Sequence, residues 1–337
     1  MRKFVSLILG LIIAAGALVS GQDSTGVKGF NYSRLKPVVH FFTNAEFNPS
    51  KGTSKDYSFW IGRALLGFNY QFDTRWSAKL LIDRTRLTGS INTMYVKVAH
   101  IRWEPDNRFA LEIGTVNQNN YIPFETFYGY RFVAETFQDR YYGTPSSDIG
   151  IIGYFKLSKK ISFDAAITNG EGPRIDQDDF GKLRFAGGLN FSPVSQIQTR
   201  VFYQLKSSGE PGRLAKEHLF NANITYKAGE KARFGIELNY IKDFMSVSGT
   251  DSYGGTAFGC ITLYKSLNFL VRYDRLIMKR PIEIPGAIPF SQNACITGFS
   301  LSPAKGITIC LNYQGSYRIM ESSQANHRIL FSFEYRI

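Results

Sequence analysis

Apolar and polar residues alternate with a period of two along most of this chain, and this alternation constrains the fold more than any other feature. It begins near residue 35 and continues to the C-terminus, where residues 328–337 read Arg-Ile-Leu-Phe-Ser-Phe-Glu-Tyr-Arg-Ile. Successive side chains of a β-strand point to opposite faces, so each such segment has one apolar and one polar face. Helical periodicity is nearly absent. The pattern predicts an all-β chain.

The alternation divides into sixteen predicted strands joined by connections of two kinds. The strands are centred near residues 42, 65, 79, 97, 112, 152, 164, 186, 201, 221, 236, 258, 272, 297, 311 and 331. Short connections cover residues 72–74, 104–107, 158–160, 192–194, 227–230, 265–266 and 302–305. Longer ones cover residues 49–56, 86–90, 117–147, 169–182, 206–215, 243–254, 279–293 and 320–326. This regular alternation of short and long is typical of transmembrane barrels, which have tight periplasmic turns and long extracellular loops.

The N-terminal segment predicts export. Arg2 and Lys3 precede an apolar stretch, residues 4–18, and small residues follow at Val19-Ser20-Gly21. We expect residues 1–21 to be a signal peptide and Gln22 to begin the mature chain, with an uncleaved anchor helix as the alternative. No later apolar run reaches the ~18 residues of a spanning helix, so a mature chain that crosses a membrane must close into a barrel. We therefore predict one domain, residues 22–337: an antiparallel transmembrane β-barrel of about 16 strands in the bacterial outer membrane.

Composition agrees with a barrel and argues against other classes of protein. Aromatic residues make up 15% of the chain and charged residues 20%, a balance expected where apolar and polar side chains alternate. The net charge of +13 is spread along the chain without a basic block, which argues against nucleic acid as a partner. Cys260, Cys295 and Cys310 form no CxxC pair and have no histidine at metal-ligand spacing. We interpret them as small strand residues and leave a disulfide open.

The longest connection, residues 117–147, is rich in both aromatic and charged residues. Loops of more than about 12–15 residues usually have a function or are disordered, and this one is too aromatic for disorder. We predict that it folds into the barrel and narrows a pore; the alternative is a packed lid on the outer surface. Its charged residues are the candidates for the constriction: Glu125, Arg131, Glu135, Asp139 and Arg140.

Several short stretches of this region are similar to porins related to the phosphate-selective porins O and P. They are Tyr95-Val96-Lys97, Ile101-Arg102-Trp103, Gly129-Tyr130-Arg131-Phe132-Val133, Thr136-Phe137-Gln138-Asp139-Arg140-Tyr141, Ser147-Asp148-Ile149-Gly150 and Asn169-Gly170-Glu171-Gly172. The resemblance covers roughly residues 75–205 and extends to the rest only as a barrel pattern. It implies a sixteen-stranded, often trimeric porin with a constriction loop. The phosphate-selective members line the pore with a dense ladder of arginine and lysine, of which this chain carries only a part.

Side chains of opposite parity to the lipid-facing set must point into the lumen. The basic residues at such positions are Arg63, Lys79, Lys97, Arg184, Arg200, Arg233, Arg272 and Arg328. The acidic ones are Asp83, Glu112, Asp164, Glu237, Asp274 and Glu334. Rings of charge select ions of opposite sign, so eight basic against six acidic residues indicate a weak preference for anions. The alternative is that these charges pair across neighbouring strands and only solvate the lumen.

The function that these patterns favour is passive diffusion of small hydrophilic solutes or ions. The partners would be outer-membrane lipids, small hydrophilic or anionic solutes, the barrel-assembly machinery and, by the resemblance, two further copies of the chain. We expect no catalytic residue, metal or cofactor, because His40, His100, His218 and His327 are scattered and no catalytic motif occurs. An occluded barrel that acts through its outer loops as a structural, adhesive or receptor protein is the main alternative. A barrel lipase or protease is a third.

Overall fold

The computed structural model describes residues 31–50, 57–86, 92–177, 180–279, 291–319 and 325–337. The predicted signal peptide lies outside the described residues. Two compact units divide the chain, Met1–Lys36 and Pro37–Ile337. In the first, the Asn31 side chain accepts a 3.0 Å hydrogen bond from the Ser33 amide at the start of a 3₁₀ helix, η1 (Tyr32–Arg34). Among the described helices, none has the length and apolarity that crossing a membrane requires.

Sixteen strands follow η1, and each includes the centre predicted for it. They are β1 (Leu35–Phe47), β2 (Tyr57–Gln71), β3 (Trp76–Arg86), β4 (Asn92–Trp103), β5 (Phe109–Asn117), β6 (Ser147–Lys156), β7 (Ile161–Thr168), β8 (Arg184–Val194), β9 (Ile197–Lys206), β10 (Glu217–Ala228), β11 (Ala232–Lys242), β12 (Ser252–Tyr264), β13 (Leu267–Met278), β14 (Gln292–Ala304), β15 (Ile307–Arg318) and β16 (Ala325–Arg336).

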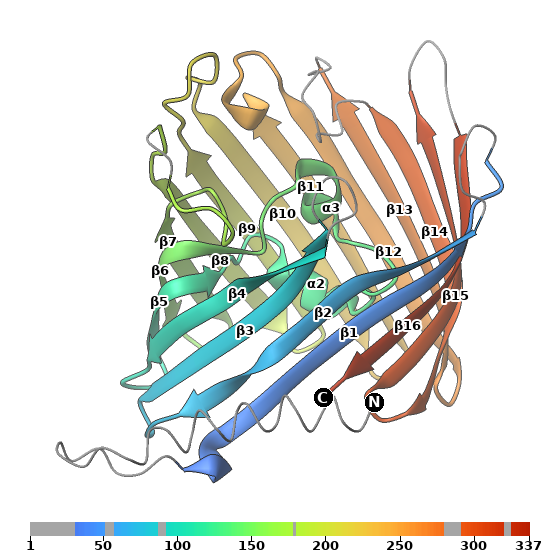
Figure 1. Cartoon of the computed structure of the whole chain (residues 1–337), viewed down its shortest axis with the longest axis horizontal. Coiled ribbons are helices and arrows are strands. Elements are labelled where there is room, and N and C mark those ends of the chain that lie inside the picture. Colours follow the sequence, from blue (N-terminus) through green and yellow to red (C-terminus); the bar gives the residue numbers. More distant parts are fainter. Residues whose placement is uncertain (1–30, 51–56, 87–91, 178–179, 280–290, 320–324) are drawn as a thin grey trace. The chain divides into compact units, whose positions relative to one another are not determined.

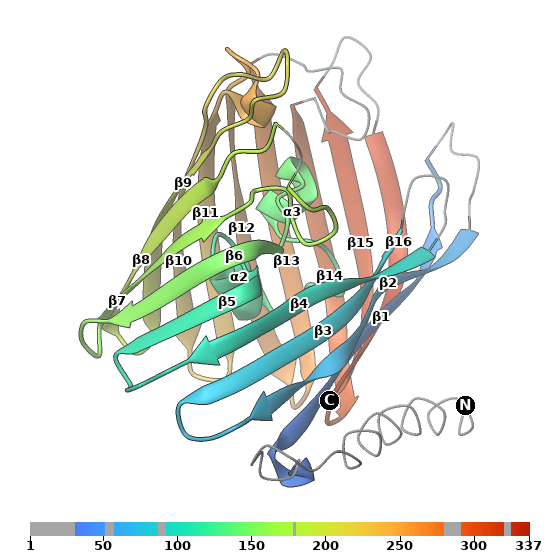
Figure 2. The same cartoon turned by 60° about the vertical axis from the view of Figure 1, so that its left-hand side comes forward.

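The strands form one closed antiparallel barrel in chain order, with β1 paired to β16 (Figures 1 and 2). The closing register runs from His40 opposite Arg336 to Phe47 opposite Ile329. Closure gives every strand two hydrogen-bonded neighbours, so no strand edge stays unpaired. The predicted fold, an all-β antiparallel barrel of 16 strands, is confirmed.

The two faces of the barrel wall differ in polarity in the way the alternation predicts. On β11, Phe234, Ile236 and Leu238 are 40%, 49% and 61% exposed, whereas Glu237 and Asn239 are buried. The apolar side chains therefore cover the outside and the polar ones face inward. This is the reverse of a soluble domain, and it suits a wall surrounded by hydrocarbon.

Connections alternate in length around the ring. From the strand bounds, two to five residues join the strands at one end, and five to 29 residues join them at the other. The tight turn between β14 and β15 requires glycine: Gly306 has φ +78°, and an added Cβ would lie 2.3 Å from the carbonyl oxygen of Arg336. Long and short connections alternate as predicted, except that the connections after β3 and after β4 both have five residues.

Aromatic rings line the outer surface near the short-turn end of β3 to β7. Ring centroids of Trp76 and Trp103 lie 6.0 Å apart, and those of Trp103 and Phe109 lie 5.9 Å apart. The series continues with Phe109 and Phe155 at 5.1 Å and with the stacked pair Phe155 and Phe163 at 4.5 Å. Rings at this height suit the boundary between hydrocarbon and water.

Candidate functional site

The connection between β5 and β6, residues 118–146 and here called the inner loop, lies inside the ring of strands (Figures 1 and 2). It contains two short helices, α2 (Ile122–Tyr128) and α3 (Phe137–Tyr142). Pro123 is the second residue of α2, where its fixed φ suits the first helical turn. Gly129 and Gly143 end the helices in the left-handed conformation, at φ 68° and 61°. Two glycines therefore let the loop turn sharply enough to stay within the barrel.

Apolar side chains attach the inner loop to one part of the wall. The ring of Phe258 on β12 meets Phe124 and Tyr128 edge-on, at centroid distances of 5.5 and 5.0 Å. These residues belong to a buried cluster that also contains Tyr130, Phe132, Leu270, Ile296 and Cys310. Several inward positions of β12 to β15 are thus apolar where the loop covers them, and the hydrophobic effect holds the loop on this side.

Buried hydrogen bonds between side chains add to this attachment. The Gln138 amide nitrogen donates to Glu237 at 3.2 Å and to Asn239 at 2.9 Å. The Tyr141 hydroxyl donates to Asp274 at 2.9 Å, and the hydroxyls of Tyr130 and Ser300 lie 2.8 Å apart. Each buried bond contributes about 1 kcal/mol, and bonds to a charged group contribute about 1.5–3 kcal/mol.

Two wall residues bind the backbone of the inner loop directly. Arg272 donates to the carbonyl oxygen of Glu135 at 2.7 Å, and Gln314 donates to that of Val133 at 2.9 Å. Arg272 also pairs with Asp274 at 2.8 Å, so its guanidinium is oriented before it meets the loop. The segment between α2 and α3 is therefore held in place by β13 and β15.

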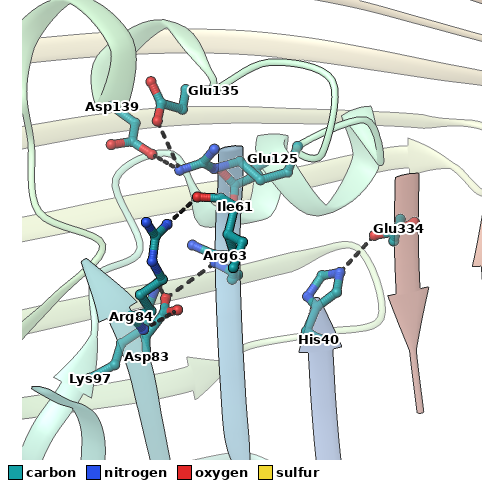
Figure 3. A network of polar contacts seen from close by, with 11 residues as sticks. His40, Ile61, Arg63, Asp83, Arg84, Lys97, Glu125, Glu135, Asp139 and Glu334 are labelled. Atoms are coloured by element: carbon teal, nitrogen blue, oxygen red, sulfur yellow. Dashed lines mark hydrogen bonds and ion pairs between the residues drawn. The ribbon is translucent and has the colours of Figure 1, made fainter. Parts of the chain in front are cut away.

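On the side facing β2 to β4 the inner loop carries a cluster of charges, in which Glu125, Glu135 and Asp139 lie close together (Figure 3). Arg131 lies among these three carboxylates. The guanidinium lies 3.1 Å from Glu125, 3.5 Å from Glu135 and 2.7 Å from Asp139. Burial raises the pKa of Asp139 to about 6; Arg131 opposes this, and Glu135 and Glu125 add to it. With three carboxylates around one guanidinium, the cluster is acidic at neutral pH.

A basic group on β2 to β4 lines the same cavity as the Arg131 cluster. Arg63 and Lys97 share Asp83, at 3.2 and 3.3 Å (Figure 3). Arg84 donates to the carbonyl oxygen of Ile61. Two cations around one carboxylate give this side the opposite sign, so an acidic and a basic surface face each other across the cavity.

This cavity, here called the large cavity, has a volume of about 660 Å³ and opens toward the long-loop end of the barrel. Its ionisable lining comes from the inner loop, from β2 to β4, from the connections after β7 and β9, and from the adjoining ends of β8, β9 and β10. The basic members are Arg63, Arg84, Lys97, Arg131, Arg174, Arg184, Lys206 and Arg213, and the acidic ones are Asp83, Glu135, Asp139, Glu171, Glu210 and Glu217. A second cavity of about 330 Å³ lies between the inner loop and the short-turn end, against Asn119 and Pro123. Polar space therefore exists on both sides of the inner loop.

Arg140, the last of the predicted constriction residues, lies outside the Arg131 cluster. Its guanidinium lies 5.4 Å from the ring centroid of Tyr141, and its Nη1 has no hydrogen-bond partner among the described residues. With Arg328 and Glu135 it lines a narrow cavity of about 130 Å³ between the inner loop and the wall. The structure thus brings four of the five predicted residues together and leaves Arg140 apart.

Most of the basic residues predicted to face the lumen are engaged by carboxylates. Besides Arg63 and Lys97, Arg200 pairs with Asp164 at 2.7 Å and Arg272 with Asp274 at 2.8 Å. Arg328 lies 3.8 Å from Glu46. Pairing across and along the strands therefore accounts for much of the predicted ladder.

Three of the predicted basic residues have no carboxylate within 4.0 Å among the described residues: Lys79, Arg184 and Arg233. Arg184 is buried and donates to the Gln118 side chain. Arg233 lies over the ring of Tyr130, 5.0 Å from its centroid. Arg184 also lines the large cavity.

Sequence reasoning missed the residues that hold the inner loop. Ser300 and Gln314 lie at inward positions of their strands, and Gln138 lies in α3. Their partners are 99 to 181 residues away in the sequence, and nothing local indicates them. The three cysteines are free thiols.

No family model and no curated protein matches the sequence. Solved structures do. The outer membrane channel DcaP of Acinetobacter baumannii is 11% identical, with a TM-score of 0.68 over 92% of this chain and 100% of that chain. OprB of Pseudomonas putida is 8% identical, with a TM-score of 0.70 over 90% and 94%. OmpT of Vibrio cholerae, an outer membrane protein, is 11% identical, with a TM-score of 0.63 over 90% and 97%, and has also been solved in a trimer form.

The chain has the fold of outer-membrane channels. At these identities the likeness concerns the fold alone, and it extends over nearly the whole length of both chains. It does not single out the phosphate-selective porins among barrels of this kind.

The described residues hold no group of three or more His, Cys, Asp or Glu side chains that could bind a metal. The four histidines lie on four different strands. Two are beside carboxylates, His40 at 2.6 Å from Glu334 and His100 at 3.8 Å from Glu112. The other two meet tyrosine hydroxyls, His218 at Tyr203 and His327 at Tyr313. These contacts connect wall residues to one another.

Proposed function

We propose that this protein is a porin of the bacterial outer membrane, through which small hydrophilic solutes diffuse passively, and that the inner loop forms its constriction. One observation carries the proposal. The inner loop is fixed to β11–β15 and leaves a charged cavity between itself and β2–β4. The fold, shared with a protein described as an outer membrane channel, supports the same function. A non-enzymatic role follows from it.

The facing charges explain how such a pore would discriminate. A polar solute that loses part of its hydration shell regains hydrogen bonds and favourable charge interactions from Arg63 and Lys97 on one side and Glu135 and Asp139 on the other. An apolar solute of equal size would have to displace water from these charges without replacing its interactions. The constriction therefore favours hydrophilic solutes.

We further propose a weak preference for anions. Eight basic and six acidic side chains line the large cavity, named above, and Arg184 has no carboxylate partner within 4.0 Å among the described residues. The excess is only two charges, and four of the eight cations lie within 4.0 Å of a carboxylate, namely Arg63, Lys97, Arg131 and Arg213. The preference should therefore be modest. These charges do not favour phosphate over other small anions.

The proposal includes export and assembly. The chain would lose residues 1–21 on export and be inserted by the barrel-assembly machinery. Mass spectrometry of protein purified from outer membranes should find Gln22 as the first residue. A mature chain that retains the apolar segment would support the anchor helix instead.

A trimer would cover the shortest part of the wall. β5, β6 and β7 have 9, 10 and 8 residues. Eight residues tilted by ~45° cover roughly 19 Å of height, less than the ~25 Å apolar band of a barrel. Ile113, Ile151 and Ile167 lie side by side on its outer face, 51%, 45% and 48% exposed.

We propose that further copies of the chain pack on this face. Native mass spectrometry in mild detergent should find three chains in the complex. A monomer would contradict the proposal.

Single-channel recording tests the main proposal. Purified protein in planar bilayers with KCl on both sides should give steady conductance steps, and a KCl gradient should give a reversal potential slightly on the anion side. Folding is verified first by the altered gel mobility of unheated protein. Silence from folded protein would refute the porin and favour the occluded barrel.

A further inference from the structure

The stretch Ser147–Gly150 and the stretch Asn169–Gly172 lie about twenty residues apart in the sequence and meet at one carboxylate, that of Asp148. Asp148, at the start of β6, accepts hydrogen bonds from the backbone amides of Gly170 at 2.7 Å and Gly172 at 3.1 Å. It also accepts one from Ile149 at 2.9 Å. The Asp148 side chain is fully buried. A buried carboxylate with three N–H donors is well satisfied, and such charge-assisted bonds are about twice as strong as neutral ones.

The glycines are needed for this contact. Gly170 and Gly172 have φ of +96° and +86°, which side-chain-bearing residues rarely adopt. A Cβ on Gly172 would also lie 3.1 Å from the Cβ of Pro145, a residue of the inner loop. The connection after β7 is thus packed directly against the end of the inner loop.

Beyond Gly172 the chain reaches toward a wall strand that is not its neighbour. The Arg174 guanidinium lies 5.5 Å from the ring centroid of Tyr95 on β4. β5 and β6 separate β4 from β7, so residues 169–174 pass along the inner side of these two strands. Gly170, Glu171, Gly172 and Arg174 all line the large cavity.

We propose that residues 169–174 form a second constriction element of the pore, and that Asp148 is the positioning residue that docks it. This inference rests on the proposed function. The segment would narrow the mouth along β4 to β7, beside the Arg131 cluster, and bring Glu171 and Arg174 to the solute path. Asp148 would thereby influence conductance without touching the solute.

The test uses the full-length protein and two readouts. Asp148→Ala removes the acceptor, and Asp176→Ala, an exposed residue of the same connection, is the matched control for charge. Trypsin cuts after Arg174, so the rate of this cleavage in detergent reports whether the segment is docked. We expect on the order of tenfold faster cleavage in Asp148→Ala and no change in Asp176→Ala, since the bonds removed are charge-assisted. In bilayers, Asp148→Ala should show larger conductance and more current noise.

The two readouts separate this inference from the porin proposal. Cleavage at the wild-type rate in Asp148→Ala would overturn the docking role. Faster cleavage with unchanged conductance would overturn the constricting role while leaving the porin intact. A silent wild-type channel would refute the porin itself. If Asp148→Ala fails to fold, Gly172→Ala keeps the carboxylate but disturbs the same contact, and it should show the same faster cleavage.

Discussion

Among single residues, the ratio of carboxylates to guanidinium groups sets the charge of the constriction. Among the described residues, Arg131 is the only cation within 4.0 Å of Glu125, Glu135 and Asp139. Glu135 is half exposed toward the cavity, so its charge is felt by a passing ion. On the opposite side, Asp83 is shared by two cations. Changes of one charge in either group should therefore be measurable as changes in ion selectivity.

Arg131→Ala should shift the reversal potential toward cations, because three carboxylates would remain without their guanidinium. Arg131→Lys keeps the charge and should shift selectivity much less, although it loses the paired geometry. Reversal potentials in a KCl gradient provide the measurement. Equal shifts for the two variants would mean that Arg131 acts through the shape of the loop and not through its charge.

Selectivity should also depend on pH through Asp139. Since burial raises the pKa of this carboxyl to about 6, acidification from pH 7 to pH 5 protonates it and removes one negative charge from the cluster. The reversal potential should then move toward anions, and Asp139→Asn should lose that part of the response. By linkage, this group stabilises the folded loop below its ordinary pKa of 3.8, and the contribution is lost as pH rises through about 6. An identical pH response in Asp139→Asn would exclude Asp139 as its source.

At the scale of elements, the inner loop owes its position to apolar patches on an otherwise polar inner wall. Phe258, Leu270 and Ile296 occupy inward positions of β12, β13 and β14. Their alternation with neighbouring residues predicts the strands and the inward direction of these side chains. An apolar side chain that faces a polar lumen is unexpected, however, unless another segment of the chain covers it. The loop was predicted to be structured because of its aromatic content. Which strands it would contact was not predictable, because those contacts join residues 133 to 181 positions apart.

Phe258→Ala should loosen the inner loop. Removing a buried phenyl ring that contacts Phe124 and Tyr128 costs about 3–5 kcal/mol in a packed core. The barrel should still form, but the current should become noisier and proteases should cut the loop faster at Arg131 and Arg140. Phe234→Ala, an exposed position on the neighbouring strand, is the control and should leave both properties unchanged. Quiet wild-type-like currents in Phe258→Ala would contradict the anchoring role.

At the scale of the whole molecule, the outward band of apolar side chains fits only an apolar solvent. Two residues on the adjacent strands β10 and β11 allow a test of this lipid-facing assignment. Leu238 points outward and is 61% exposed, whereas Asn223 lies opposite the inward Glu237. Leu238→Arg should impair folding into lipid vesicles by about 2–4 kcal/mol, the cost of a cation near the bilayer midplane. Asn223→Arg places the same side chain in the lumen and should fold nearly as well as wild type. Folded fractions follow from the gel mobility of unheated samples, and equal folding of both variants would refute the lipid-facing assignment.

The period of two is enough to predict the sixteen strands and their inward and outward faces, because it is local and repeated in every strand. The contacts of the inner loop and of the connection after β7 become visible only in the folded barrel. They join Arg131 to Glu125, Glu135 and Asp139, Gln138 to Glu237 and Asn239, and Asp148 to Gly170 and Gly172. Closure of the barrel explains this difference. Bending the sheet into a ring and folding a loop inside it brings together residues that are far apart in the sequence, and no local pattern indicates which of them will be in contact.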